Sequence, residues 1–284
     1  EMCIRDRRKS EYDRQVNSPK SIDTFNELIT LTKIDDNRFS ARSPKYNWGR
    51  VYGGQVVAQA LNAAKQTVDP KYHVHSIHAY FIRGGSSDEV IDLEVDRLRD
   101  GKSFVTRRVV ALQSPGAILN LSASFQIHED GPKIQERSLP NDLPLPEDLT
   151  SDNWSNIMER KVVPEGTLSS GHGVWIRLNG DTEHDQSSYE LGLVYASDDA
   201  PFDAAARLHP EFDGNWDNDE APNFFGASLD HAVWFHQKSN PYDWQFHHHV
   251  GVTHMGNRGL ATGAIYSKSG MHLATVTQEI LQRF

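Results

Sequence analysis

The alternation of apolar and polar residues divides the first half of the chain into one helix and a series of strands. From Val56 to Val68 the apolar residues recur at spacings that place them on one face of a helix. Strands are predicted over 74–85, 90–96, 103–113 and 117–128, and the segment VIDLEVD alternates apolar and acidic residues with a period of two. Residues 24–43 contain strand-like pieces on either side of an Asp-Asp turn. We therefore expect a helix followed by several antiparallel strands.

A second set of elements follows in the same order after a segment without periodicity. Residues 132–165 are rich in proline and acidic residues over much of their length, and we predict a linker there. Beyond it, strands are predicted over 173–181 and 188–197, a helix over 199–209, and strands over 228–236, 244–254, 259–269 and 272–282. The expected organisation is an N-terminal repeat over 21–131 and a C-terminal repeat over 166–284.

Two short matches between the halves support a duplication. The tetrapeptide that starts at His78 (HAYF) resembles the one that starts at His231 (HAVW), and LSASFQ, ending at Gln126, resembles LATVTQ, ending at Gln278. Both matches occur at nearly the same offset. Because each apolar face must be buried against another element, we predict an α+β fold of two copies, each a helix wrapped by an antiparallel sheet.

Composition narrows the classes of protein. The 284 residues carry a net charge of −10, which argues against a general nucleic-acid binder. The apolar runs are short, so neither a membrane-spanning helix nor a secretory signal is predicted. With Cys3 as the single cysteine, we expect no disulfide within the chain and a reducing compartment such as the cytoplasm.

The two ends of the chain bear on where the fold begins and on where the protein is located. The first 20 residues are charged and lack periodicity, so we expect a leader outside the fold. The C-terminal sequence EILQRF shows no Ser-Lys-Leu peroxisomal address, although a peroxisomal location stays open if the chain continues beyond Phe284.

A glycine pair directly before the first predicted helix raises the question of phosphate binding. Gly53 and Gly54 could present backbone N–H groups to an anion. The segment lacks the three spaced glycines of a dinucleotide fingerprint, and the chain has no P-loop. We therefore favour close packing at a helix start over a phosphate site.

Three polar residues of the second half are candidates for chemistry. Asp198 stands at the predicted entrance of the second helix, where it is either an N-terminal cap or a general base facing a pocket. Gln278 shares one strand face with apolar residues, so its amide needs a hydrogen-bond partner, which is either structural or a water or substrate. Ser228 begins a strand and is either an ordinary strand residue or a group that orients a water. Asp230 and His231 are neighbours in a strand and point to opposite faces, so we do not expect them to act as a pair.

The histidine run His247-His248-His249 invites a test for a metal site. In a strand only His247 and His249 share a face, and no carboxylate-spaced or H-E-x-x-H pattern accompanies them. We expect no metal and interpret the run as a histidine-rich, partly exposed strand.

Several segments together resemble the acyl-CoA thioesterase II family. They are RVYGGQVVAQALNAA, HSIHAYFIRGG, RDGKSFVTRRVVALQ and ASFQIHE in the first half, and YASD, SLDHAVWFH and VTQEILQR in the second. The resemblance covers most of the chain from about residue 24 and is weakest in the linker and around 202–226. It implies a double hotdog fold, in which two helix-in-sheet repeats lie in one chain.

The resemblance also implies an activity and a set of residues. Members of the family hydrolyse acyl-CoA to a fatty acid and CoA with an Asp, a Thr or Ser and a Gln that hold the attacking water. The matching positions here are Asp198, Ser228 and Gln278, with no cofactor or metal. The expected substrate is a medium- or long-chain acyl-CoA, without nucleic acid or membrane insertion, and exposed sheet edges favour a homo-oligomer. An acidic segment at 211–220 leaves the chain-length preference open.

Two other functions stay open on the sequence alone. A non-catalytic acyl-CoA binding module would share the fold, although the complete Asp, Ser and Gln set argues against it. A hotdog hydratase acting on enoyl thioesters would need an acid and a histidine together on the helix. Asp203 and His209 do not convincingly provide that pair.

Overall fold

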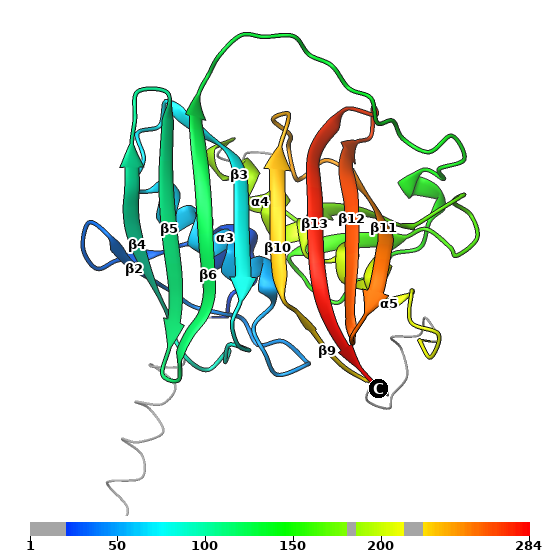
Figure 1. The fold of residues 1–284 in the computed structure, drawn as a ribbon, viewed down its shortest axis with the longest axis horizontal. Helices are drawn as coiled ribbons and strands as arrows, with labels where there is room; N and C mark the ends of the chain where they lie inside the picture. Colours follow the sequence, from blue (N-terminus) through cyan, green and yellow to red (C-terminus); the bar gives the residue numbers. More distant parts are fainter. Residues whose placement is uncertain (1–20, 181–185, 213–223) are drawn as a thin grey trace, which may run out of the picture.

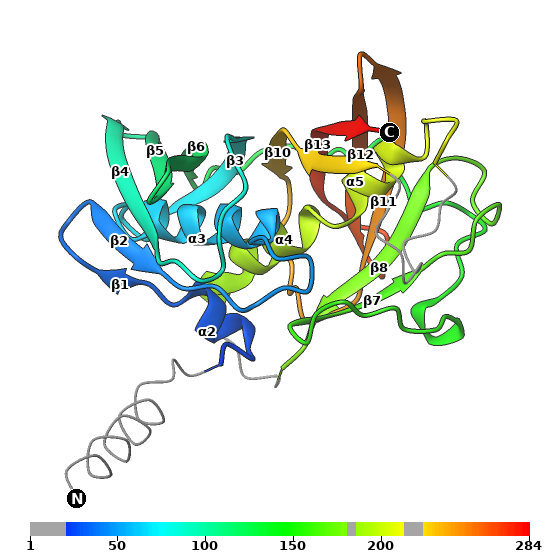
Figure 2. The same cartoon turned by 90° about the horizontal axis from the view of Figure 1, so that it is seen from below.

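The computed structural model forms one continuous antiparallel sheet that curls around the helices (Figures 1 and 2). It describes residues 21–180, 186–212 and 224–284, so the expected leader and most of the acidic segment 211–220 lie outside the described residues. The strand order is β1-β2-β4-β5-β6-β3-β10-β13-β12-β11-β8-β7, and β9 pairs with β13. The two halves therefore join edge to edge where β3 pairs with β10.

The strands of the first half are β1 (Thr32–Lys33), β2 (Arg38–Ala41), β3 (Tyr72–Phe81), β4 (Ile91–Asp100), β5 (Phe104–Gln113) and β6 (Gly116–Ile127). Those of the second half are β7 (Met158–Val162), β8 (His172–Leu178), β9 (Phe225–Ser228), β10 (Asp230–Phe235), β11 (Gln245–Met255), β12 (Arg258–Ser267) and β13 (His272–Arg283). The α-helices are α2 (Phe25–Ile29), α3 (Gly53–Lys65), α4 (Tyr189–Ser197) and α5 (Ala200–Ala206), and short 3₁₀ turns lie at η1 (Pro146–Asp148) and η2 (Gln186–Ser188). This arrangement confirms the predicted α+β class with a helix inside the curved sheet of each half.

Helices α3 and α4 lie side by side and run in opposite directions. At one end Lys65, the last residue of α3, forms an ion pair of 2.8 Å with Glu190 in the first turn of α4. At the other end the N–H of Gly54, in the first turn of α3, donates to Asp198, which follows the last residue of α4. The two contacts fix both ends of the helix pair and bring the start of α3 against the end of α4.

The buried face of each element follows its sequence pattern. In α3, residues 54–61 are all buried, because the helix lies between the sheet and α4. In β4 the side chains of Ile91, Leu93 and Val95 are buried and those between them are exposed, as the period of two predicts. Core residues from both halves form one continuous apolar cluster around α3 and α4. The site described below therefore rests on a single core.

Two of the predicted elements were wrong. Residues 189–197 form helix α4 where we predicted a strand, and residues 25–29 form helix α2, which begins at a capping box made by Thr24 and Glu27. Every residue of α4 from Leu191 to Ser197 is buried, so the segment is apolar on all sides and lacks helical periodicity. The range expected as linker also contains strand β7, which is short and charged.

The local matches between the halves do not superpose residue by residue. His78 is exposed whereas His231 is fully buried, and Gln126 is half-buried whereas Gln278 is fully buried. A shift of one position moves a strand residue to the opposite face of the sheet. The two halves thus share their architecture, while the matched residues occupy different environments.

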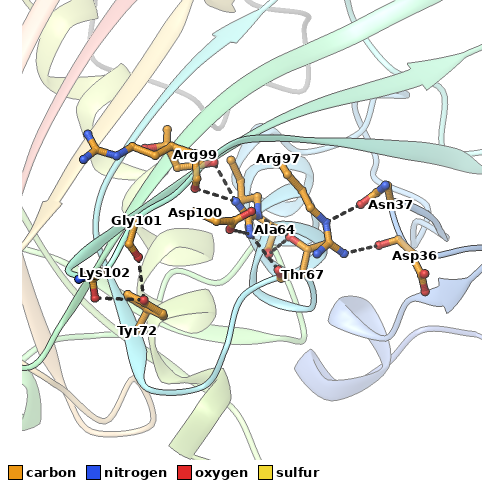
Figure 3. A network of polar contacts seen from close by, with 12 residues as sticks. Asp36, Asn37, Ala64, Thr67, Tyr72, Arg97, Arg99, Asp100, Gly101 and Lys102 are labelled. Atoms are coloured by element: carbon orange, nitrogen blue, oxygen red, sulfur yellow. Dashed lines mark hydrogen bonds and ion pairs between the residues drawn. The ribbon is translucent and has the colours of Figure 1, made fainter.

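A buried arginine ties the far end of α3 to the sheet. Arg107 on β5 is 1% exposed, and its guanidinium donates to the hydroxyl and carbonyl oxygens of Thr67, at 2.8 and 3.0 Å, just beyond the helix. It also donates to the carbonyl of Arg99 and forms an ion pair of 2.5 Å with Asp100. Figure 3 labels Thr67, Arg99 and Asp100, which supply these acceptors. Because the guanidinium is paired on several sides, this buried charge holds α3 in place.

The two edges of the sheet are short. Strand β1 has two residues, and β7 carries Glu159, Arg160 and Lys161, so neither offers a long apolar edge. Homo-oligomer formation therefore stays a prediction. No helix of the described residues is long and apolar enough to cross a membrane.

Candidate active site

The start of α3 and the end of α4 meet at Asp198. The N–H of Gly54 donates to Asp198 Oδ2 at 2.8 Å. A Cβ added at Gly53 would lie 2.6 Å from the same oxygen, and one added at Gly54 would lie 2.4 Å from the carbonyl oxygen of Tyr195. The glycine pair thus allows two helix ends to approach more closely than any other residue would permit. This confirms the packing interpretation of the pair.

Asp198 is held in an apolar environment. Its residue is 6% exposed, and the aromatic rings of Tyr52 and Tyr195 pack against each other beside it with centroids 5.2 Å apart. The pKa of Asp198 is raised to about 7, chiefly by burial and to a lesser extent by neighbouring Asp199, while the Gly54 N–H and the Gln278 side chain act in the opposite direction. A carboxyl with this pKa can accept and release a proton near neutral pH.

The position of Asp198 differs from the prediction. We expected Asp198 at the start of the second helix, but it caps the C-terminal end of α4, and Asp199 stands at the N-cap of α5. The Asp199 side chain makes no capping bond and instead accepts from Trp154 Nε1 at 2.7 Å and Arg160 Nε at 3.2 Å. The positive helix end that faces Asp198 is that of α3, in the N-terminal repeat, whereas the three predicted residues all lie in the C-terminal repeat.

Gln278 lies close to both of the other predicted residues. It lies on β13 and is fully buried, and its Nε2 donates to the hydroxyl of Ser228, the last residue of β9, at 2.9 Å. Its side chain also lies near the Asp198 carboxyl and lowers the pKa of that group. The structure therefore brings Asp198, Ser228 and Gln278 together around one amide, from three separate elements.

A fourth residue, His231 on β10, belongs to this group, and the sequence reasoning missed it. Its Nδ1 lies 2.6 Å from Gln278 Oε1 and its Nε2 lies 2.8 Å from the hydroxyl of Ser197. The available signal was the period of two, which places His231 on the same buried face as Val233. The strand register that pairs Ala232 with Thr277 then sets His231 beside Gln278.

Asp230 lies apart from this group, as predicted. Its Oδ1 accepts from the backbone N–H of Glu279 at 2.7 Å, which joins β10 to β13. Its side chain is half-buried, whereas that of His231 is fully buried on the opposite face. The structure thus gives Asp230 a bond to the backbone rather than a contact with the imidazole.

Strand β11 is partly exposed, as expected, but two of the three histidines of the run are fully buried. His247 and His249 share the inward face of β11 and are both 0% exposed, whereas His248 Nε2 donates to the Ser170 carbonyl oxygen at 2.9 Å. Burial lowers the pKa of His247 to about 3 and keeps His249 neutral as well. Within the described residues, no group of three or more His, Cys, Asp or Glu side chains is arranged to hold a metal ion.

A separate hollow of about 1120 Å³ lies at the opposite end of the helix pair. Its walls come from the end of α3, the start of α4, β3, β6 and the segment after β10, and include Lys65, Tyr72, His75, Tyr189 and Lys238. None of Asp198, Ser228, His231 and Gln278 lines it. The chemistry of the site therefore lies at the other end of the helices.

The fold and the site together define a class of protein. A helix-in-sheet repeat occurs twice in one chain, and a buried acid, an amide and a hydroxyl meet between the two repeats. No G-x-S-x-G nucleophile elbow surrounds Ser228. The repeated helix-in-sheet fold is that of the double-hotdog thioesterases.

Comparisons with known proteins identify the family. The family model of the acyl-CoA thioesterase N-terminal domain matches residues 42–126, and that of acyl-CoA thioesterase matches residues 147–281. Acyl-CoA thioesterase 2 of Haemophilus influenzae is 35% identical, with 90% of this chain and 96% of the relative covered. Acyl-coenzyme A thioesterase 8 of Homo sapiens is 29% identical, with 89% and 86% covered.

A solved structure agrees with these relatives. Acyl-CoA thioesterase II TesB2 of Mycobacterium marinum superposes with a TM-score of 0.80 at 32% identity, covering 91% of this chain and 98% of that one. The chain belongs to the acyl-CoA thioesterase II family, and it is an acyl-CoA thioester hydrolase.

Proposed function

We propose that the protein hydrolyses medium- and long-chain acyl-CoA by direct attack of a water molecule that Asp198 activates. The observation that carries this proposal is the position of the Gln278 amide. It donates to the Ser228 hydroxyl and lies near Asp198, a buried carboxyl whose pKa is about 7. A thioester is already a reactive acyl donor, so an oriented and partly deprotonated water is sufficient as nucleophile.

The steps follow from the positions of the side chains. Ionised Asp198 keeps Oδ2 bonded to the Gly54 N–H, while Oδ1 is buried and has no hydrogen-bond partner among the described residues. Oδ1 is therefore the acceptor for a proton of the attacking water. Gln278 holds the Ser228 hydroxyl, which fixes the water from a second side and lowers the entropic cost of attack.

The proposed reaction forms no covalent enzyme intermediate. The water oxygen bonds to the thioester carbonyl carbon as its proton passes to Asp198. The tetrahedral intermediate collapses, the carbon–sulfur bond breaks, and protonated Asp198 returns the proton to the CoA sulfur. The products are a free fatty acid and CoA, and the carboxyl is ready for another cycle.

The test measures thiol release from a series of acyl-CoA substrates of increasing chain length. The wild type is expected to hydrolyse medium and long chains. Asp198→Ala is expected to lose activity by ~10²–10⁴-fold with an unchanged circular dichroism spectrum, since general base catalysis contributes about that much. Asp230→Asn is the matched control, because it changes a carboxyl two residues from Ser228 and leaves the Gln278 contacts in place. Normal turnover by Asp198→Ala would overturn the assignment of the base.

A second variant pair tests the hydroxyl. Ser228→Ala removes the group that accepts from Gln278 Nε2, so we expect a lower kcat. Ser228→Thr keeps the hydroxyl, and it is expected to retain more activity than Ser228→Ala. Saturable acyl-CoA binding without turnover by the wild type would instead favour a binding module.

A further inference from the structure

We propose that His231 is a positioning residue, a neutral imidazole protonated on Nδ1 that holds the Gln278 amide with its N–H groups directed at Ser228 and Asp198. This inference deepens the proposed function and rests on it. It concerns a residue outside the predicted catalytic set. In this role His231 touches neither the substrate nor the attacking water and acts through Gln278.

The contacts around His231 form one chain of hydrogen bonds. The chain runs from Ser197 Oγ to His231 Nε2 at 2.8 Å, from His231 Nδ1 to Gln278 Oε1 at 2.6 Å, and from Gln278 Nε2 to Ser228 Oγ at 2.9 Å. Ser197, His231 and Gln278 are all 0% exposed. Because these three residues are shielded from solvent, water does not compete for the hydrogen bonds between them, and each bond has a fixed donor and acceptor.

The position of each proton follows from the chemistry of the groups. An amide oxygen only accepts, so His231 must donate from Nδ1 when Oε1 of Gln278 faces it. Burial lowers the pKa of His231 to about 4, which keeps the imidazole neutral. A neutral imidazole has one N–H, so Nε2 is an acceptor. The single proton of the Ser197 hydroxyl is then directed at Nε2 rather than at the Val194 carbonyl oxygen, which also lies within hydrogen-bond distance of Oγ.

The opposite tautomer would reverse the amide. With the proton on Nε2, His231 would donate to Ser197 Oγ, whose hydroxyl would then donate to the Val194 carbonyl, 2.9 Å away. The Gln278 amide would turn over, and its oxygen would face Ser228 and the Asp198 carboxylate. An amide oxygen next to an ionised carboxylate is repulsive, whereas an amide N–H stabilises it. Ionised Asp198 therefore selects the Nδ1-protonated form.

The direct test is the tautomer of His231. Protein labelled with ¹⁵N at histidine is measured at pH 8 by long-range ¹H–¹⁵N correlation, which separates Nδ1–H, Nε2–H and doubly protonated rings. The His231→Asn spectrum identifies the resonances of His231 by their absence. The expected result is a neutral ring with its proton on Nδ1. A neutral ring protonated on Nε2, or an imidazolium, would overturn the proposal.

A pair of substitutions provides the functional readout. His231→Asn retains a side-chain N–H close to the position of Nδ1, whereas His231→Leu keeps bulk and removes the donor. We expect His231→Leu to lower kcat by ~10²-fold with a KM within about threefold, as for a misplaced catalytic group. His231→Asn is expected to recover at least about tenfold of that loss. Equal kcat values for the two variants, at comparable melting temperatures, would contradict a positioning role.

The two tests separate this inference from the proposed function. The tautomer is read without substrate, so it stands or falls independently of turnover. If the wild type fails to hydrolyse acyl-CoA while Nδ1 carries the proton, the proposed function fails and the hydrogen-bond arrangement survives. If the wild type is active and the proton lies on Nε2, only the role of His231 is refuted. If His231→Leu does not fold, the spectrum and His231→Asn still decide the matter.

Discussion

Asparagine in place of Asp198 keeps an oxygen for the Gly54 N–H but cannot accept a proton from water. We therefore expect kcat to fall by ~10²–10⁴-fold with little change in KM. In the wild type, the pKa of about 7 predicts that kcat/KM falls roughly tenfold for each pH unit below 7, because only ionised Asp198 acts as base. A carboxyl with an ordinary pKa near 3.8 would keep the activity constant down to about pH 5.

The same substitution has a predicted effect on stability. The pKa of Asp198 is higher in the folded than in the unfolded protein, so its contribution to stability is complete below about pH 4 and is lost as the pH rises through 7. At 1.36 kcal/mol per pKa unit, the loss amounts to about 4 kcal/mol. Asparagine does not titrate. The free energy of unfolding of Asp198→Asn minus that of the wild type is therefore expected to be about 3 kcal/mol larger at pH 8 than at pH 5, so the variant is relatively more stable at pH 8.

Both effects are measurable on the same proteins. Steady-state hydrolysis over pH 5–9 gives the acid limb, and urea unfolding of wild type and Asp198→Asn at pH 5 and pH 8 gives the stability difference. An acid limb near pH 4, or a stability difference that does not change with pH, would show that Asp198 has an ordinary pKa. That result would refute the reasoning from burial between the two helix ends.

Three further substitutions, the last with a matched control, test packing at the site and elsewhere in the fold. Gly54→Ala places a Cβ 2.4 Å from the Tyr195 carbonyl oxygen, so we expect a loss of about 1–3 kcal/mol in unfolding free energy together with reduced kcat. His247→Phe removes a ring whose pKa burial lowers from 6.5 to about 3; the wild type loses stability as the pH falls below 6.5, and the variant is expected to lose about 2 kcal/mol less between pH 7 and 5. Arg107→Leu leaves buried carbonyls without donors and is expected to cost about 2–5 kcal/mol by urea unfolding, whereas Arg108→Leu, which breaks an exposed ion pair, is expected to cost less than about 1 kcal/mol.

Most of the fold could be predicted because its strands alternate and its first helix is periodic. The long strands of the first half, such as the one that contains VIDLEVD, have one buried and one exposed face. Apolar and polar residues therefore alternate along their sequence. Helix α4 could not be recognised in this way. Its residues from Leu191 to Ser197 are all buried, and so short a buried run has no periodicity to distinguish a helix from a buried strand.

Local sequence motifs identify some residues of the site, whereas other contacts depend on how the helices and strands pack. Asp198, Ser228 and Gln278 were found through a resemblance of motifs, and the structure brings them together around one amide. The contact of Asp198 with Gly54 depends on the antiparallel packing of α3 and α4, which no local pattern encodes. His231 could have been predicted, because its strand face and the pairing of β10 with β13 place it beside Gln278.

Direct attack by water, with Asp198 as base, can be tested by following oxygen from labelled solvent. Wild-type enzyme in excess over a long-chain acyl-CoA completes a single turnover in H₂¹⁸O, and mass spectrometry then examines the fatty acid and the peptide that contains Asp198. Attack by water places one ¹⁸O in the fatty acid and leaves the peptide unlabelled. A peptide heavier by about 2 Da, with unlabelled fatty acid, would show that Asp198 forms an acyl-enzyme and would contradict the general-base account.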